Sequence, residues 1–94
     1  MPRALFNGEV LAESDHTRVV EGNHCFPPDS VREDLLIESP TRTLCFRKGK
    51  ASYRSLSTDD GVVEDVAWTY ERPWPLARRL AGHVAFGPQV RIER

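Results

Sequence analysis

The stretch TRTLCFRKGKASYRSL, residues 41–56, holds two short segments in which apolar and polar side chains alternate. Alternation with a period of two is typical of half-buried strands, so the pattern predicts strands over Thr41–Arg47 and Ala51–Leu56. Gly49 interrupts the alternation between them, and a glycine at such a break favours a bulge or a close backbone approach. The stretch therefore predicts two neighbouring strands of a β-rich domain.

The same pattern of short runs separated by Gly, Pro, Asp and Ser continues on both sides. The pair Asn7-Gly8 tolerates positive φ and suits a tight hairpin turn, and Thr58–Gly61 predicts a second turn. Further strands are expected at Val10–Ala12, Thr17–Glu21, Val63–Tyr70, His83–Phe86 and Val90–Ile92. The 94 residues thus predict one mostly β domain over 1–94, a small barrel or sandwich of short antiparallel strands.

One or two short helical turns are expected between the strands. After a double proline, Asp29 or Ser30 is placed to cap a short turn, with Glu33 as the capping-box partner of Ser30. We expect Ser39-Pro40 to close this segment, because the residue before a proline is pushed out of the helical region. The segment Leu76–Ala81 fits either a single helical turn or a loop.

Composition excludes several classes of protein. Hydrophobic residues make up 39% and charged residues 29% of the chain, which is ordinary for a globular protein. The formal net charge is −1, so no long-range field favours nucleic acid, and no nucleic-acid partner is expected. No apolar run is long enough to span a bilayer, and Asn7-Gly8 interrupts the N-terminal segment too early for a signal peptide. We therefore expect a cytoplasmic protein without a membrane partner, with Cys25 and Cys45 as reduced thiols.

Six segments, taken in order along nearly the whole chain, resemble the DUF427 family. They are Asn7–Ser14, Val19–Gly22, Phe26–Val31, Thr43–Tyr53, Ala67–Pro73 and Gly82–Phe86. The sequence departs from the family pattern at Phe46, where proline is common, and at Gly87, where an aromatic residue is common. The resemblance implies a compact all-β fold of the β-tent type, as in zinc-binding and methionine-sulfoxide-reductase-like domains, and it implies no established activity. The family also carries a nucleotidyltransferase-style label.

Metal and nucleotide chemistry find little support in the residues. A structural zinc site needs four ligands, usually from paired Cys-x-x-Cys motifs. The best set available here is His24, Cys25, Cys45 and His83. Since adjacent strand residues point to opposite faces, His24 and Cys25 rarely ligate one ion together, and we expect no metal and no cofactor. The acidic pair Asp59-Asp60 lies in a turn, and Lys48-Gly49-Lys50 lacks the rest of a phosphate-binding loop.

A pocket of mixed character is the first functional hypothesis. The family-like motifs concentrate polar, aromatic and thiol side chains, and such a mixture is common in small-molecule sites. The candidate ligand-binding residues are Lys48, Tyr53, Cys45, Trp68 and Tyr70. Lys48 would pair with an anionic group of a small ligand or peptide. The alternative is that Trp68 and Tyr53 belong to the core and that Lys48 pairs only with a nearby carboxylate.

Two other classes of function stay open, and so does the question whether the protein is an enzyme. Cys45 is a candidate reactive thiol with His83 or Lys48 tuning it, although a free cysteine is more commonly a small buried side chain. The other class is an interaction or scaffold domain without catalysis, marked by an exposed apolar patch and self-association. A homodimer would add core to so short a chain, but the sequence does not show one.

Overall fold

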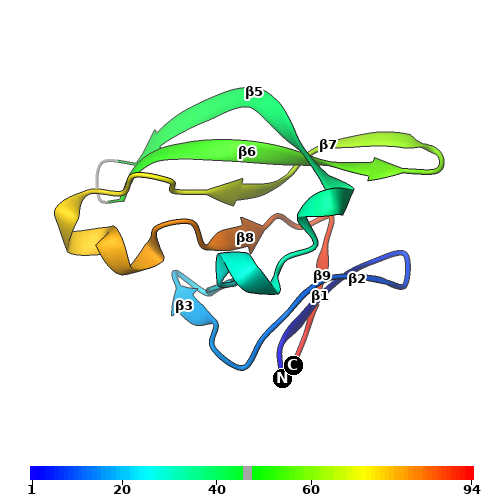
Figure 1. The fold of residues 1–94 in the computed structure, drawn as a ribbon, viewed down its shortest axis with the longest axis horizontal. Coiled ribbons are helices and arrows are strands. Elements are labelled where there is room, and N and C mark those ends of the chain that lie inside the picture. The colour runs from blue at the N-terminus through cyan, green and yellow to red at the C-terminus, as the bar shows by residue number, and fades with distance from the viewer. Residues whose placement is uncertain (46–47) are drawn as a thin grey trace.

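The computed structural model describes residues 1–45 and 48–94 and confirms a mostly β fold class. Three antiparallel sheets make up the described chain, and they do not close into a barrel (Figure 1). The first has the order β2 (Glu9–Glu13), β1 (Arg3–Phe6), β9 (Arg91–Glu93). The second is the hairpin of β3 (Arg18–Val20) and β4 (Asn23–Cys25). The third has the order β5 (Leu36–Cys45), β6 (Gly49–Thr58), β7 (Gly61–Thr69), β8 (Val84–Phe86).

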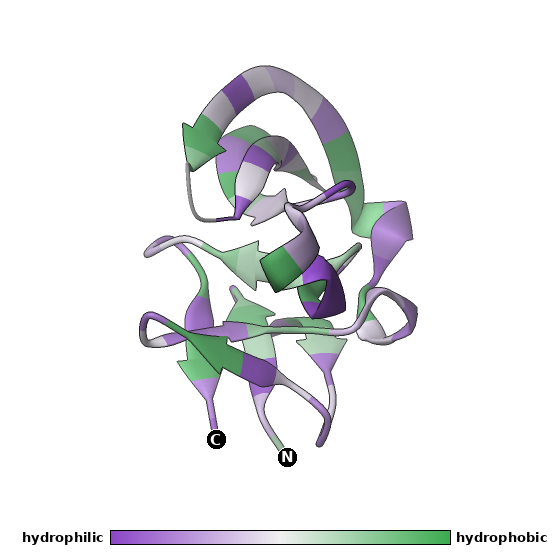
Figure 2. Cartoon of the chain, turned by 90° about the vertical axis from the view of Figure 1, so that its left-hand side faces the viewer, coloured by the Kyte–Doolittle hydropathy of each residue, from purple (hydrophilic) through white to green (hydrophobic). Residues whose placement is uncertain are grey.

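Local turn signals locate the hairpins correctly. Asn7 and Gly8 both have positive φ, 49° and 81°, and they form the tight turn that the sequence predicts, here between β1 and β2. The turn between β6 and β7 falls at Thr58–Gly61 as expected. The sequence did not predict β1, which lies between β2 and β9 and places the two chain ends side by side (Figures 1 and 2).

The expectation that Ser39-Pro40 closes a segment is wrong, because β5 continues through both residues to Cys45. Two features of the sheet accommodate the proline. β5 is an edge strand, where a missing N–H costs no ladder hydrogen bond, and its register with β6 shifts between Glu38 and Arg42. The Asp65 carboxylate of β7 (itself at φ 53°) accepts the hydroxyls of Ser39 and Thr41 and holds this bulge in place. The predicted end of this strand at Arg47 lies outside the described residues.

The helical turns are three short 3-10 segments, η1 (Pro28–Ser30), η2 (Glu33–Leu35) and η3 (Pro75–Leu80). The predicted capping box is wrong, because no side chain caps η1 or η2 and the Ser30 hydroxyl donates to the carbonyl of Pro27 at 2.7 Å. In Figure 2, η3 lies in the foreground, with hydrophobic and hydrophilic residues following one another along it. Nowhere in the described ranges does a helix have the length and apolarity needed to cross a membrane.

Two hydrophobic clusters lie against the four-stranded sheet. The main cluster packs between the sheets and centres on Phe26, Leu11 and Val66, which are fully buried. Phe26 meets Phe86 edge to face at a centroid distance of 5.8 Å. A second, smaller cluster holds Cys25, Leu80 and Ala85, with Val20, Trp68 and Ala77 packed against it. The second cluster forms the base of the candidate site.

Candidate functional site

A pocket of about 180 Å³ opens beside the second cluster, between the β3–β4 hairpin and the four-stranded sheet. Strands β6 and β7 contribute Tyr53 and Trp68 to its lining, and Tyr70 follows directly after β7. Lys48 comes from the residue before β6. The remaining lining residues are Val20, Glu21, Asn23, Cys25, Leu80 and Ala85. We call this space the Lys48 pocket.

The backbone around Lys48 is fixed by contacts on both sides. Its N–H donates to the carbonyl of Cys45 at 3.2 Å, and its carbonyl accepts the N–H of Trp74 at 2.9 Å. Gly49 has a φ of +114°, and a Cβ there would lie 3.3 Å from the Cα of Pro73. Only glycine combines this φ with so close a backbone approach, so Gly49 lets the chain place Lys48 at the pocket.

The ammonium group of Lys48 lies between a carboxylate and an aromatic ring. Its Nζ is 2.5 Å from Oε1 of Glu21 and 5.7 Å from the ring centroid of Tyr70, within the range of a cation–π contact. The Lys48 side chain is only 14% exposed, whereas that of Glu21 is 59% exposed. The lysine is therefore the inner partner of this ion pair, and the glutamate reaches it from the solvent side.

Two neighbouring aromatic rings form a wall of the pocket. Tyr53 and Trp68 are directly paired across β6 and β7, and their ring centroids are 6.1 Å apart with an interplanar angle of 41°. The Tyr53 hydroxyl lies 3.4 Å from the hydroxyl of Thr43 on β5. Trp68 also packs against the second cluster, so it serves as core and as pocket lining at once.

The charge state of the pocket follows from burial and from the ion pair. Burial lowers the pKa of Lys48, but the hydrogen bond with Glu21 and nearby negative charges outweigh it and leave this pKa raised. Burial also raises the pKa of Tyr70 and of Cys25, and in both cases the Lys48 charge opposes the rise only in part. At neutral pH the pocket thus contains a charged ammonium beside a neutral phenol and a neutral thiol.

Four of the five residues predicted for ligand binding come together in this pocket: Lys48, Tyr53, Trp68 and Tyr70. Cys45 is not among the lining residues, although it lies near enough to act electrostatically on Lys48 and Tyr70. The thiol that lines the pocket is Cys25, which sequence reasoning did not select. Sequence reasoning also missed Glu21, and the signal available for it was an acidic residue beside Gly22 in a family-like turn motif.

The β3–β4 hairpin supplies these missed residues because it docks on β8. Phe26, directly after β4, exchanges two backbone hydrogen bonds of 2.8 Å with Val84 of β8. The turn residues of the hairpin have positive φ, 53° at Glu21 and 83° at Gly22. The hairpin therefore places Glu21 and Cys25 beside β8, at the edge of the four-stranded sheet to which Trp68 also belongs.

The two candidate catalytic residues, Cys45 and His83, lie on different parts of the described chain. His83 lies before β8, is not a lining residue, and its Nδ1 is 3.3 Å from the carbonyl oxygen of Ala81. Among the described residues no hydrogen bond links Cys45 to His83, and both Cys25 and Cys45 are free thiols. The described ranges also contain no group of three or more His, Cys, Asp or Glu side chains arranged to hold a metal ion. A reactive Cys45 stays a prediction that alkylation tests.

Comparison with known proteins places the chain in a family. The family model described as "Domain of unknown function (DUF427)" matches residues 2–94. A search of curated proteins finds no match. The match spans all the residues of the Lys48 pocket and all the segments on which the sequence resemblance rests. The chain is a member of the DUF427 family.

Proposed function

We propose that this protein binds a small anionic ligand in the Lys48 pocket. The observation that carries the proposal is the ion pair of Lys48, whose ammonium group is held inside the pocket while its partner carboxylate comes from the solvent side. A carboxylate of the chain itself thus occupies the position that an anionic ligand would take. Because the Glu21 side chain is 59% exposed, it can move into water when a ligand replaces it.

The size and lining of the pocket narrow the ligand class. A volume of about 180 Å³ equals the share of roughly six water molecules in the liquid. It lies below the roughly 300 Å³ at which pockets for drug-sized ligands begin. The rings of Tyr53 and Trp68 and the side chain of Leu80 offer apolar contact beside the ammonium group. A compact carboxylate with a small apolar or aromatic body therefore suits the pocket better than a nucleotide does.

The direct test is an NMR titration of the labelled protein with sodium benzoate, with acetate and inorganic phosphate as comparison anions. Benzoate should give saturable shifts at the amides around the pocket and should bind more tightly than acetate. Removing the ammonium group in Lys48→Met should weaken benzoate binding at least about tenfold, the loss expected for a charge-assisted hydrogen bond.

Lys50→Met is the matched control, since Lys50 is an exposed lysine on the other side of Gly49 and is not a lining residue of the pocket. It should leave benzoate binding unchanged. Tyr53→Phe tests the ring against the hydroxyl and should keep most of the affinity. The proposal is wrong if none of the three anions binds, or if both lysine variants bind benzoate as the wild type does.

A further inference from the structure

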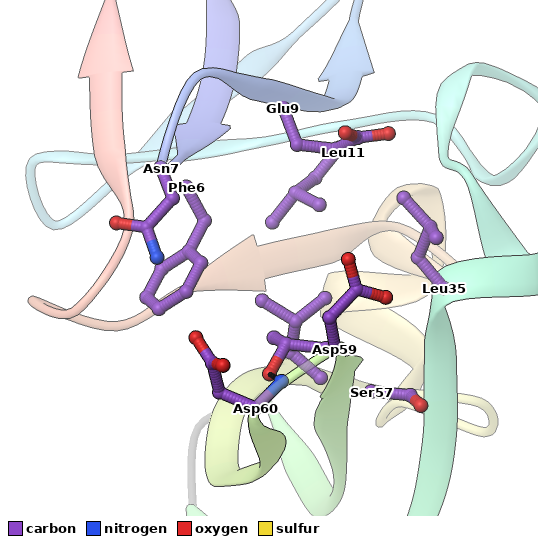
Figure 3. A pocket seen from close by; sticks show the side chains of 10 residues that line it. Phe6, Asn7, Glu9, Leu11, Leu35, Ser57, Asp59 and Asp60 are labelled. Carbon is purple, nitrogen blue, oxygen red and sulfur yellow. Dashed lines mark hydrogen bonds between the residues drawn. The ribbon is translucent and has the colours of Figure 1, made fainter.

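A second pocket, larger than the first, lies where two hairpin turns approach each other. Its volume is about 420 Å³, within the range typical of small-molecule sites. One side comes from the β1–β2 turn, the other from the β6–β7 turn, and Leu35 of η2 closes the space between them (Figure 3). We call it the hairpin pocket. It shares no lining residue with the Lys48 pocket.

Four of the ten residues that line the hairpin pocket are apolar. Its floor is formed by Leu11 and Leu56, which are 0% and 2% exposed and belong to the main cluster. Phe6 and Leu35 are partly buried against the same cluster and form the walls. Figure 3 shows the Phe6 ring and the Leu11 and Leu35 side chains around one shared space. An apolar group that enters this space would lose water contact on several sides.

The rim of the pocket carries uncompensated negative charge. Figure 3 shows the carboxylates of Asp59 and Asp60 rising from the β6–β7 turn on one side and Glu9 on the other. None of these three carboxylates accepts a hydrogen bond or forms an ion pair with a described residue. Arg32 is near enough for the charge of Glu9 to raise its pKa, but its guanidinium is committed to Asp34 by two hydrogen bonds of 3.0 and 2.9 Å.

The β6–β7 turn that carries two of these carboxylates is fixed before any ligand arrives. The Thr58 hydroxyl donates to the carbonyl of Gly61 at 2.8 Å and accepts the N–H of Asp60 at 3.2 Å. Two aspartates are therefore held at the rim without a local cation to neutralise them. Holding like charges together in this way has an electrostatic cost that a bound cation would relieve.

The arrangement of the rim carboxylates suits an organic cation better than a metal ion. The described residues contain no group of three or more acidic, His or Cys side chains gathered closely enough to ligate a metal. The carboxylates stand around the opening and do not converge on one point, and Phe6 and Leu35 offer apolar contact beside them. We propose that the hairpin pocket binds a small organic amine, with its ammonium group at the rim and its apolar body against Phe6 and Leu35.

The test is a second NMR titration, at low ionic strength, with phenethylammonium, the neutral 2-phenylethanol and the anionic phenylacetate as a size-matched series. The ammonium compound should bind most tightly, shift the amides of residues 6–11 and 56–60, and weaken as salt is added. The double variant Asp59→Asn/Asp60→Asn should weaken it by about two- to fivefold for each carboxylate removed. Asparagine suits turns, so this variant should fold normally.

Glu64→Gln is the matched control, because Glu64 is an exposed carboxylate on β7 that does not line the pocket. Glu64→Gln should leave amine binding unchanged. Lys48→Met, which removes the ammonium group of the anion site, should also leave amine binding unchanged, because the two pockets share no lining residue. Equal affinity for the three compounds, or shifts elsewhere in the chain, would overturn the proposal. So would calcium chloride shifting the same amides, or self-association in sedimentation that covers the pocket without amine.

Discussion

Glu21 occupies a turn position that glutamate rarely takes. Replacing it allows the strain of the turn and the energy of the ion pair with Lys48 to be measured separately. Glu21 and Gly22 have φ values of 53° and 83° between Val20 and Asn23, which pair directly. Two consecutive positive φ values define the hairpin turn in which Asn-Gly is the preferred sequence. A residue other than glycine in this region costs roughly 1–2 kcal/mol, and asparagine relieves part of that cost by bonding to the local backbone.

The comparison of Glu21→Asn with Glu21→Gln isolates the cost of the turn. Both variants lose the charge that faces Lys48, and with one partner 59% exposed this pair is worth about 0.2–1 kcal/mol. Only Glu21→Asn also relieves the turn, by about 0.5–1 kcal/mol. For a domain of this length, 1 kcal/mol shifts Tm by about 4–8 °C, so Glu21→Asn should melt about 2–8 °C above Glu21→Gln.

Thermal unfolding followed by circular dichroism, with urea unfolding as a second measure, tests this difference. If Glu21→Gln is as stable as Glu21→Asn, the turn stores no strain and the reasoning fails. The same two variants also bear on the anion site. Both should bind benzoate more tightly than the wild type, because the internal carboxylate no longer competes for Lys48. Weaker benzoate binding in both would mean that Glu21 supports the site and does not compete with a ligand.

Four further substitutions have expected outcomes. Gly49→Ala should lower the free energy of unfolding, measured in urea, by at least about 2 kcal/mol, because the φ of +114° and the backbone 3.3 Å away both oppose a Cβ. Gly8→Ala, where a Cβ would enter open space, should lower it by only about 1 kcal/mol. Asp65→Ala should cost about 2–3 kcal/mol because its carboxylate accepts two hydroxyl donors from β5, and an unchanged urea midpoint would contradict this. Burial raises the pKa of Cys25 above its ordinary value of 9.0, so the stability that the buried thiol contributes is complete below that pH and is lost as pH rises through the folded-state pKa. Cys25→Ala should therefore flatten the decline in the free energy of unfolding at alkaline pH. An identical pH profile of stability in the variant would exclude the thiol as the cause of the decline.

Local signals were enough for the turns and for most strands. Asn7-Gly8 and Thr58–Gly61 form turns because their own φ preferences and side-chain hydrogen bonds select them, whatever surrounds them. The remaining features of the fold depend on which strands pair with one another. β1 lacked a strong pattern of its own and is held between β2 and β9, and Pro40 is tolerated because β5 lies at the sheet edge. Neither fact is visible in a window of neighbouring residues.

The candidate site divides in the same way. The sequence by itself selected Lys48, Tyr53, Trp68 and Tyr70, because they fall in the family-like motifs. The direct pairing of β6 with β7, which the structure shows, brings Tyr53 and Trp68 together in the lining. Only the tertiary structure replaced Cys45 with Cys25 in the lining and brought Glu21 to the ammonium group. These two residues come from a hairpin that reaches the sheet through Phe26 and Val84, which are far apart in sequence. A contact of that range follows from packing of the whole chain, and no local periodicity encodes it.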